Sequence, residues 1–333
     1  MRRTVIAAAL ILIAGIIQPT PAAEDVFRIG MIGLDTSHVI AFTRAINNMA
    51  GEYGCKVVAG YPGGSPDVEA SATRVERFTN QLRDEHGLDI VESIEELCGK
   101  VDGVMLESVD GRPHLRQAKP VIAAGLPLFI DKPMAGNLAD VIEIFRLAKE
   151  ADVPCWSSSS LRYTDGVRTA RSDPNLGGVV GCDVYGPCSL EPHHPDLYWY
   201  GVHGVEMLFT VMGPGCNSVS RTQTDAYEFV VGTWSDGRIG TYRGLKTGKK
   251  GYGGTIFGGK QIVPAGDYPG YGPLIERVVK FFKTGKVAVP AEETIEIFAF
   301  MSAADVSKTK GGAPVSIKRV MEQAKRRSAK PRR

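Results

Sequence analysis

Short apolar runs alternate with amphipathic stretches over the first half of the chain. Five runs have the length and the β-branched or aromatic content of strands: 27–33, 55–61, 102–108, 126–133 and 153–158. Between them, apolar residues recur at helical spacing over 37–49, 67–85, 93–98, 113–124 and 137–150. Strands separated by such helices predict a doubly wound parallel α/β sheet over residues 24–158, whose ligands lie at the carboxyl ends of the strands.

The pattern changes after about residue 159. Longer strand-like runs, joined by turns such as Ser235-Asp236-Gly237, predict antiparallel strands over 177–187, 227–244 and 253–264. Helical spacing returns over 201–212, 272–284 and 290–310. These elements predict a second, α+β domain over residues 159–317 with a mostly antiparallel sheet.

Composition and charge agree with two globular domains. The chain has 333 residues, of which 43% are hydrophobic and 23% charged, and this excludes a disordered, collagen-like, coiled-coil or polytopic membrane protein. The formal net charge of +2 is uneven, because eight basic residues and one Glu lie in 318–333. The remaining body is acidic, so we expect no nucleic-acid partner, since the basic residues of such proteins line a folded face. We expect the basic tail to be a solvated end, with a surface or partner contact as the alternative.

The first 23 residues have the order of a secretory signal peptide. Two arginines precede an apolar run over residues 5–17, and prolines and small residues follow it. This run is shorter than the ~20 apolar residues of a membrane-spanning helix. We therefore expect cleavage near residue 23, export to the periplasm and no stable membrane insertion afterwards; an uncleaved anchor is the alternative. The pair Arg2-Arg3 is compatible with the twin-arginine export route, although two arginines alone discriminate poorly.

Cysteine and histidine spacing does not indicate a metal site. The six cysteines form no C-x-x-C pair, which argues against structural zinc. Cys182 and Cys188 flank a short segment and could form a disulfide in an oxidising compartment. His193 and His194 are adjacent, and adjacent histidines rarely reach one ion, so we predict no metal.

The turn after the first predicted strand carries the first candidate motif, which reads Gly33-Leu34-Asp35-Thr36-Ser37-His38. A dinucleotide-binding fold typically has G-x-G-x-x-G here, because bare backbone approaches a diphosphate at the helix N-terminus. The first glycine is present, but Asp35 brings a negative charge to the position of the diphosphate. Thr36, Ser37 and free backbone N–H groups could still bind phosphate; alternatively, Asp35 or Ser37 only caps the helix. The second strand ends at Tyr61 without the acidic residue that usually binds ribose hydroxyls, so NAD and NADP both remain open.

The second motif is Asp131-Lys132-Pro133, at the end of the run 126–133. A lysine at the carboxyl end of a parallel strand is well placed for a cleft, where its ammonium can polarise a hydroxyl or a carbonyl. An ordinary surface lysine beside a turn is the alternative.

The third motif is the pair His203 and Glu206, which share one face of the predicted helix 201–212. An imidazole titrates near neutral pH and suits proton transfer to a substrate oxygen, although a lone helical histidine can also be structural. The neighbouring aromatic residues could stack on a sugar or pack in the core: Tyr198, Trp199, Tyr200 and, later in the chain, Trp234.

Residues 102–154 resemble the Gfo/Idh/MocA oxidoreductases, the family that contains glucose-fructose oxidoreductase and inositol dehydrogenase. That family has the same order of a strand end, a histidine near an Ala-rich helix and a Glu-Lys-Pro motif, which is Asp131-Lys132-Pro133 here. Residues 200–213 are similar to the family's helix with the catalytic histidine and an acidic residue three positions later. The resemblance extends over roughly residues 26–310.

The resemblance implies an N-terminal Rossmann domain, a C-terminal domain with an open sheet, and a homo-oligomer, either a dimer or a tetramer. It also implies NAD or NADP, which could be tightly bound, and a sugar, polyol or related substrate. Lys132 would orient the reacting hydroxyl, His203 would take or give its proton, and hydride would pass between the substrate carbon and nicotinamide C4. Residues expected to contact the cofactor are Gly33, Leu34, Asp35, Thr36, Ser37, His38, Glu107, His114, Asp131 and Lys132. Residues expected to contact the substrate are Arg162, Tyr200, Glu206 and Trp234.

Three functions are therefore open from the sequence. The first is an exported NAD(P)-dependent oxidoreductase acting on a CH–OH group. The second is a glycosidase or lyase with a resident NAD(H) that is recycled without net redox change. The third is a carbohydrate-binding or scaffold protein that has lost the cofactor.

Overall fold

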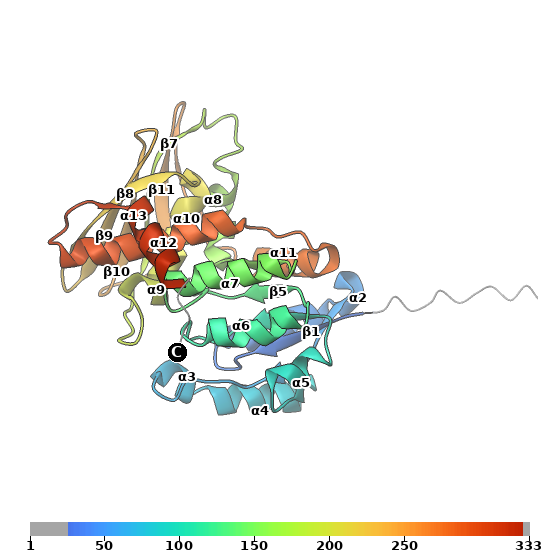
Figure 1. Cartoon of the computed structure of the whole chain (residues 1–333). Helices are drawn as coiled ribbons and strands as arrows, with labels where there is room; N and C mark the ends of the chain where they lie inside the picture. The colour runs from blue at the N-terminus through green and yellow to red at the C-terminus, as the bar shows by residue number, and fades with distance from the viewer. Residues whose placement is uncertain (1–25, 329–333) are drawn as a thin grey trace, which may run out of the picture.

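The structure, a computed structural model, describes residues 26–328 and has two lobes, with the first sheet below and the second above in Figure 1. The predicted signal peptide lies outside the described residues. Within residues 26–328, no helix has the length and apolar character needed to cross a bilayer.

The lower lobe contains a six-stranded parallel sheet in the order β3-β2-β1-β4-β5-β6. Its strands are β1 (Phe27–Ile32), β2 (Cys55–Tyr61), β3 (Asp89–Ile90), β4 (Gly103–Leu106), β5 (Leu128–Ile130) and β6 (Cys155–Ser157). This order is that of the Rossmann fold, so the predicted fold class is confirmed. The carboxyl ends of β1, β4 and β5 are adjacent, and this edge of the sheet faces the upper lobe.

Helices cover both faces of this sheet: α1 (Ser37–Asn48), α2 (Ala50–Tyr53), α3 (Glu69–Ala72), α4 (Val75–His86), α5 (Ile94–Cys98), α6 (His114–Ala123) and α7 (Leu138–Glu150). The single helix predicted over 67–85 is two helices. Thr73 ends α3, where its hydroxyl donates to the carbonyl of Glu69, and Arg74 leaves the helical conformation with φ −122°.

A late helix completes the core of the lower lobe. Helix α11 (Gly272–Thr284) packs beside α1, and its buried apolar residues share one cluster with β1 and β2. Phe282 lies so close to β4 that a Cβ added at Gly103 would be 2.8 Å from its ring. Residues 24–158 therefore do not enclose a complete core by themselves, and the domain boundary near residue 158 stays a prediction.

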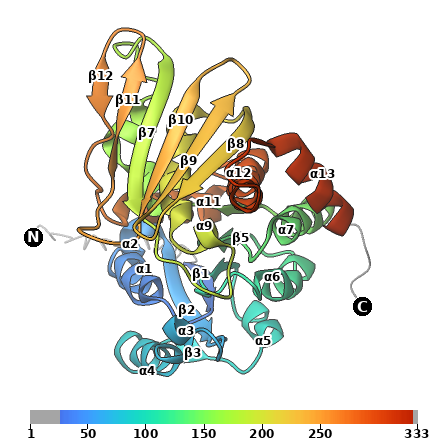
Figure 2. The same cartoon turned by 90° about the vertical axis from the view of Figure 1, so that its left-hand side faces the viewer.

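The upper lobe contains a seven-stranded sheet in the order β12-β11-β7-β10-β9-β8-β13, in which β7 and β10 are parallel and the other pairs antiparallel. Its strands are β7 (Val179–Pro187), β8 (Cys216–Gln223), β9 (Tyr227–Trp234), β10 (Ile239–Leu245), β11 (Gly253–Gly258), β12 (Ile262–Pro264) and β13 (Val315–Ser316). Its other elements are η1 (Ser160–Tyr163), α8 (Asp165–Thr169), α9 (Asp196–Trp199), α10 (Gly201–Met212) and α12 (Ala291–Thr309). Helices α10 and α12 pack on one face, and Figure 2 shows the sheet standing above the lower lobe.

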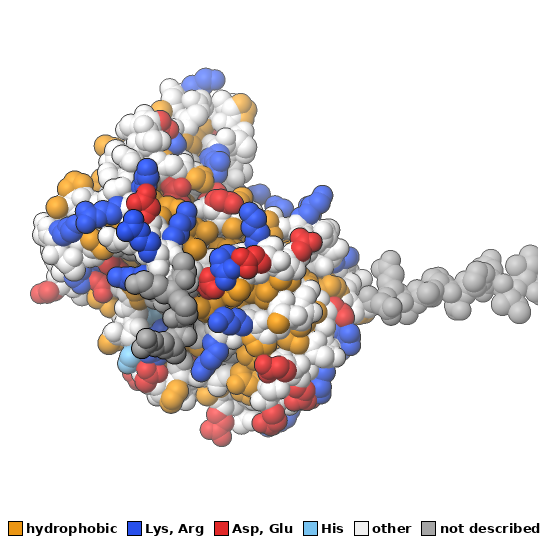
Figure 3. All heavy atoms as spheres, viewed as in Figure 1, with side chains coloured by type: hydrophobic (Ala, Val, Ile, Leu, Met, Phe, Trp, Pro, Cys, Tyr) orange, Lys and Arg blue, Asp and Glu red, His pale blue; other side chains and the backbone are white. Residues whose placement is uncertain are grey.

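The predicted solvated tail differs from the structure over its described part. Helix α13 (Ile317–Ser328) packs on α7 and buries Ile317, Val320 and Ala324. Its basic residues occupy the remaining positions, so the helix is amphipathic and docks through its apolar side. On the face seen in Figure 3, basic and acidic side chains are intermingled.

The disulfide considered for Cys182 and Cys188 is absent, and both side chains are buried free thiols. Cys182 lies within β7 and Cys188 directly follows that strand. Six residues of extended chain span about 20 Å, whereas bridged Cα atoms lie within about 7 Å of each other.

Candidate functional site

A cavity of about 260 Å³ lies between the two lobes, at the carboxyl edge of the Rossmann sheet. It brings together six of the residues predicted for the site: Thr36, Ser37, His38, Lys132, Tyr200 and His203. The other predicted residues lie beneath this cavity or in the cores of the lobes, and each has a different role, described below.

Asp35 points away from the cavity into the protein. Its carboxylate is fully buried and accepts hydrogen bonds from the Val109 N–H (2.9 Å) and the Ser71 hydroxyl (2.6 Å). It thus connects the β1–α1 turn to the loops after β2 and β4. The neighbouring Leu34 is buried, and Gly33 has φ +84° with its backbone against Ser108, where an added Cβ would lie 2.1 Å from the Ser108 hydroxyl. Asp35 therefore does not occupy the space of a ligand at the helix N-terminus.

The residues at this end of the cavity suit a dinucleotide diphosphate. Thr36 caps α1, and Ser37 is exposed in the first turn of this helix. Arg74 lines the same cavity and makes no ion pair with any residue of 26–328. A free guanidinium, a hydroxyl and the N-terminus of a 12-residue helix are typical partners of phosphate oxygens. Ser37, Arg74 and the α1 backbone would therefore hold the cofactor at this end.

Restoring the usual glycine at position 35 should weaken the protein without improving cofactor binding. Asp35→Gly leaves the Val109 N–H and the Ser71 hydroxyl without their acceptor, which should cost about 1–3 kcal/mol of unfolding free energy. Urea unfolding and NAD titration calorimetry would measure both effects. Asp35→Asn, which retains an acceptor oxygen, should lose less stability. A gain in NAD affinity for Asp35→Gly would contradict the inward role of this carboxylate.

Lys132 follows β5 and extends into the cavity from the lower lobe. Its Nζ lies 5.8 Å from the centre of the Tyr200 ring, which comes from the upper lobe. Lys132 makes no ion pair with any residue between 26 and 328, so its ammonium is available to a bound molecule.

His203 enters the cavity from the first turn of α10. Its Nδ1 lies 2.7 Å from the Ser159 hydroxyl, and its ring has edge contacts with Tyr200 and Tyr252. Burial lowers the pKa of His203 well below its ordinary value, and the nearby Lys132 and His38 lower it further. His203 is therefore neutral near neutral pH.

A buried polar group lies beneath Lys132. The His38 Nδ1 is 2.7 Å from Asp131 Oδ2, while both carboxyl oxygens of Glu107 are buried without a hydrogen-bond partner among the described residues. Burial raises the pKa of Glu107 well above its ordinary value, and the charge of Asp131 adds to this effect. Burial opposes ionisation of Asp131 as well, but His38 and Lys132 hold its pKa below the ordinary value. At neutral pH, Asp131 is the ionised carboxyl and Glu107 the neutral one.

Donor atoms of these same three residues, His38, Glu107 and Asp131, lie within 4.8 Å of one another and could in principle hold a metal ion. The 2.7 Å separation of His38 Nδ1 from Asp131 Oδ2 is that of a hydrogen bond. The absence of a metal, expected from sequence, stays a prediction.

Glu107→Gln should make stability less dependent on pH. Because the folded-state pKa of Glu107 is raised, its contribution is present below the unfolded pKa of about 4.3 and is lost as pH rises toward the folded value, by up to about 1.4 kcal/mol per pH unit. Glutamine is neutral throughout, so the melting temperature of the variant should exceed that of the wild type increasingly from pH 5 to pH 8. Thermal unfolding across this range, with the exposed Glu92→Gln as control, measures the difference. A difference that does not change with pH would mean that Glu107 is ionised in the folded protein.

Arg162 and Glu206, both predicted to bind substrate, form a buried ion-pair network instead. Arg162 donates to Glu206 Oε2 (2.6 and 2.9 Å) and to Glu293 Oε1 (2.6 Å). Glu206 Oε1 accepts the N–H of Ser159, whose hydroxyl contacts His203. These charges therefore hold the segment that orients His203, and they do not line the cavity.

Two further predicted contacts are structural. Trp234 is buried in the upper lobe, where its Nε1 donates to the Gly213 carbonyl (2.8 Å) and its ring packs on Phe209. His114 is fully buried, and its two ring nitrogens lie 3.1 and 2.9 Å from the carbonyls of Met134 and Ser108. It thereby fixes the chain after Lys132 to the end of β4.

One wall of the cavity was not predicted from the sequence. Tyr252, Tyr268 and Tyr271 line it from residues 246–271, and Tyr268 contacts the Ser160 hydroxyl (2.9 Å). The recurrent glycines and tyrosines of this segment were a usable indication, because closely spaced glycines let a chain fold tightly and leave large rings exposed to a cleft.

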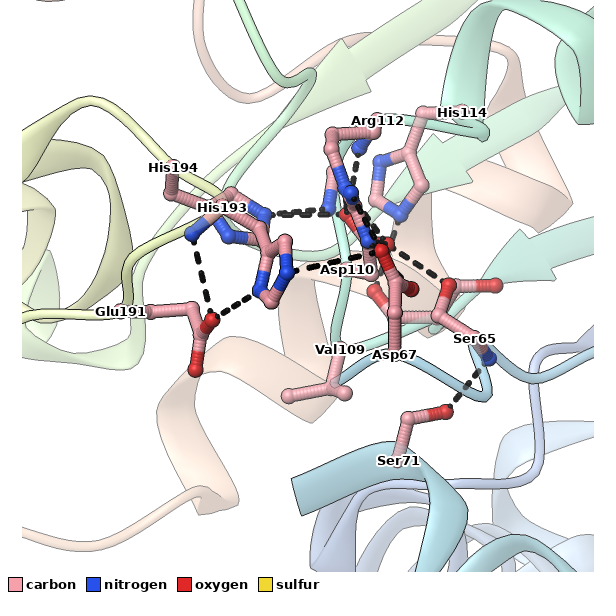
Figure 4. A network of polar contacts seen from close by, with 12 residues as sticks. Ser65, Asp67, Ser71, Val109, Asp110, Arg112, His114, Glu191, His193 and His194 are labelled. Atoms are coloured by element: carbon pink, nitrogen blue, oxygen red, sulfur yellow. Dashed lines mark hydrogen bonds and ion pairs between the residues drawn. The ribbon is translucent and has the colours of Figure 1, made fainter. Parts of the chain in front are cut away.

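His193 and His194 connect the two lobes (Figure 4). In Figure 4 they point from the upper-lobe loop toward Asp67 and Asp110, which lie on the loops after β2 and β4. His194 Nε2 is 3.0 Å from Asp110 Oδ1, and Arg112 forms ion pairs with both aspartates. Burial opposes ionisation of Asp110, but hydrogen bonds from His194, Arg112 and Ser65 hold its pKa below the ordinary value. These contacts connect the loop before α9 to the loops after β2 and β4.

Comparison with known proteins supports the interpretation of the lower lobe as a Rossmann fold. Residues 27–159 match the model of an oxidoreductase family with an NAD-binding Rossmann fold. No curated protein sequence matches the chain.

Solved structures share the fold over nearly the whole described chain. The myo-inositol 2-dehydrogenase of Lactobacillus plantarum has a TM-score of 0.72 at 15% identity, covering 87% of this chain and 99% of its own. The scyllo-inositol dehydrogenase of Lactobacillus casei, with bound NAD(H) and scyllo-inositol, has a TM-score of 0.71 at 13% identity, covering 88% and 99%. GenD2 from gentamicin A biosynthesis, in complex with NAD, has a TM-score of 0.70 at 16% identity, covering 90% and 99%. At these identities the likeness concerns the fold.

Proposed function

Because residues 27–159 match the model of the Gfo/Idh/MocA oxidoreductases, with an NAD-binding Rossmann fold, we propose that the chain is an NAD(P)-dependent oxidoreductase acting on a CH–OH group of a sugar, polyol or sugar derivative. The observation that carries the proposal is the meeting of Lys132 and His203, from different lobes, in one cavity that extends to the N-terminus of α1.

The cofactor, when bound, supplies the hydride acceptor. Ser37, Arg74 and the α1 backbone would bind its diphosphate, so that the reacting end points toward Lys132 and His203. The charged ammonium of Lys132 favours the developing negative charge on the reacting oxygen. His203, held by Ser159, contacts the same oxygen and fixes its direction.

The walls of the cavity support a polyhydroxylated substrate. Ser160 and four tyrosines line the cavity and present hydroxyl groups to a small molecule, and the tyrosines also present ring faces. The tyrosines are Tyr200, Tyr252, Tyr268 and Tyr271. Such a mixture of apolar faces and hydroxyls suits sugars and cyclitols, whose rings present apolar C–H faces and polar edges. The inositol dehydrogenases among the structural neighbours act on molecules of this kind.

The test is titration of the purified protein with NAD and NADP, followed by incubation with myo-inositol, scyllo-inositol and a panel of aldoses and glycosides. Appearance of reduced cofactor in proportion to oxidised substrate is the expected result. Breakdown of a glycoside with bound but unchanged cofactor would favour the glycosidase or lyase instead. Failure of both cofactors to bind would contradict the proposal and leave a carbohydrate-binding protein.

Export belongs to the same proposal. The charged start, short apolar run and small residues of 1–23 support cleavage and a periplasmic enzyme that retains its cofactor. N-terminal sequencing of the protein from a periplasmic fraction should find a start near residue 24. A chain that begins at Met1 and sediments with membranes would contradict it.

Self-association is also proposed. The second sheet exposes large apolar side chains on the face opposite α10 and α12, among them Tyr185 and Tyr227. Such a face favours a homo-oligomer, a dimer or a tetramer. Light scattering during gel filtration would measure the mass, and a monomer at micromolar concentration would exclude it.

A further inference from the structure

His38 lies in the cavity with an orientation that the proposed function does not use. Its ring packs against Phe42 (5.1 Å between centres) and has an edge contact with Tyr271 (4.8 Å). Its Nδ1 lies 2.7 Å from the buried Asp131 carboxylate. Its Nε2 makes no hydrogen bond with any residue of 26–328, although His38 lines the cavity. Phe42, Tyr271 and Asp131 thus fix the ring, and Nε2 is left for a molecule in the cavity.

The hydrogen-bond partners determine where the proton of this imidazole resides. An ionised carboxylate can only accept, so His38 must donate its Nδ1–H to Asp131. In the neutral ring, Nε2 then carries a lone pair directed to the cavity. A carboxylate that holds an imidazole in this way also stabilises the imidazolium that forms when Nε2 takes a proton.

The hydrogen-bond partners of His203 favour the opposite tautomer. The Ser159 oxygen accepts the N–H of Leu161 (3.1 Å), and its own proton has His203 Nδ1, at 2.7 Å, as the acceptor in reach. With Nδ1 accepting, the proton of neutral His203 resides on Nε2, which faces the cavity as a donor. The two histidines of the cavity therefore differ in what they can do: one accepts and the other donates.

We propose that His38, oriented by Asp131, is the catalytic base that takes the substrate hydroxyl proton, while His203 and Lys132 donate hydrogen bonds to its oxygen. The inference rests on the proposed function. In the oxidation, the O–H bond would break and its proton would form the Nε2–H bond of His38. A bound nicotinamide would supply the acceptor for the hydride of the broken C–H bond, and the carbonyl π bond would form between the same carbon and oxygen. The imidazolium then releases the proton to solvent, which restores the base.

The assignment of the tautomers can be tested without substrate or cofactor. Nitrogen-15 NMR of histidine-labelled protein near pH 8 distinguishes protonated from unprotonated ring nitrogens, and His38→Gln and His203→Asn assign the signals. We expect a protonated Nδ1 in His38 and a protonated Nε2 in His203. A His38 protonated at Nε2, or a His203 protonated at Nδ1, overturns the proposal.

The catalytic role is tested by turnover of scyllo-inositol with NAD, or of whichever panel compound the wild type oxidises. His38→Gln should lower kcat/KM by about 10²–10⁴ and remove the acidic limb of its pH profile. His38→Ala should regain activity with added imidazole, which a merely structural residue would not show. His203→Asn should lower kcat/KM but keep the acidic limb.

The pH profile also depends on the titratable and charged groups that face His38, which are Asp131, Glu107, Lys132, His203 and Tyr271. His86→Gln, at the end of α4 and away from the cavity, is the matched control and should match the wild type. Full kcat/KM and an unchanged profile in His38→Gln, in a protein whose wild type turns over, would overturn the assignment of His38. Absence of turnover in the wild type contradicts the proposed function itself, so the two failures differ.

Discussion

Replacing Lys132 by methionine is expected to lower kcat/KM of the oxidation by about 10²–10⁴. The substitution retains most of the side-chain length but removes the ammonium that faces Tyr200 and the reacting oxygen. Steady-state rates with NAD and the oxidised polyol would measure the loss.

Two properties should remain unchanged in Lys132→Met. Lys132 forms no ion pair within residues 26–328, so the melting temperature should stay near that of the wild type. NAD affinity should also be retained, because the proposed diphosphate partners Ser37, Arg74 and the α1 backbone are unchanged. Lys149→Met, on the exposed side of α7, is the control. A Lys132→Met protein with wild-type kcat/KM would remove Lys132 from the mechanism.

Arg162→Met should lower the unfolding free energy by about 3–5 kcal/mol. It leaves the buried Glu206 carboxylate without its counter-charge and leaves Glu293 with only Arg171, at 3.9 Å. Denaturant unfolding followed by circular dichroism would measure this loss.

A compensated variant separates stability from substrate binding. Combining Arg162→Met with Glu206→Gln and Glu293→Gln removes the unpaired charges and should recover part of the stability. If Arg162→Met instead keeps its stability and raises only KM, Arg162 would be a substrate ligand, as predicted from the sequence.

Most of the lower lobe could be predicted from the sequence because its elements are short and regularly spaced. The strands near 27–33, 55–61 and 102–108 appear within a few residues of their expected ends. Helix α11 could be placed in the sequence but not in space, since periodicity shows that a helix has an apolar face and not what that face covers. Helix α13 likewise could not be placed in space, because its many basic residues favoured a solvated tail although one side of the helix is apolar and packs on α7.

Side-chain direction limited the prediction of the site. Lys132 and His203 are predicted because their residue types and positions carry chemistry by themselves, and the structure places both at the cavity. Asp35, Arg162 and Glu206 were assigned to ligands, whereas each forms internal hydrogen bonds or ion pairs with residues distant in sequence. A pattern of one sequence does not show such long-range partners, so buried charges and ligand-binding charges look alike.

The place of α11 in the lower lobe has a consequence for synthesis and folding. The apolar face that Leu274, Phe281 and Phe282 cover stays open until residue 284 has left the ribosome. The core of the lower lobe therefore cannot be completed until α11 has been synthesised. Contacts of such long sequence separation slow folding. A chain cut after residue 158 should expose this face and aggregate. The two lobes, although distinct in shape, are then one unit of folding.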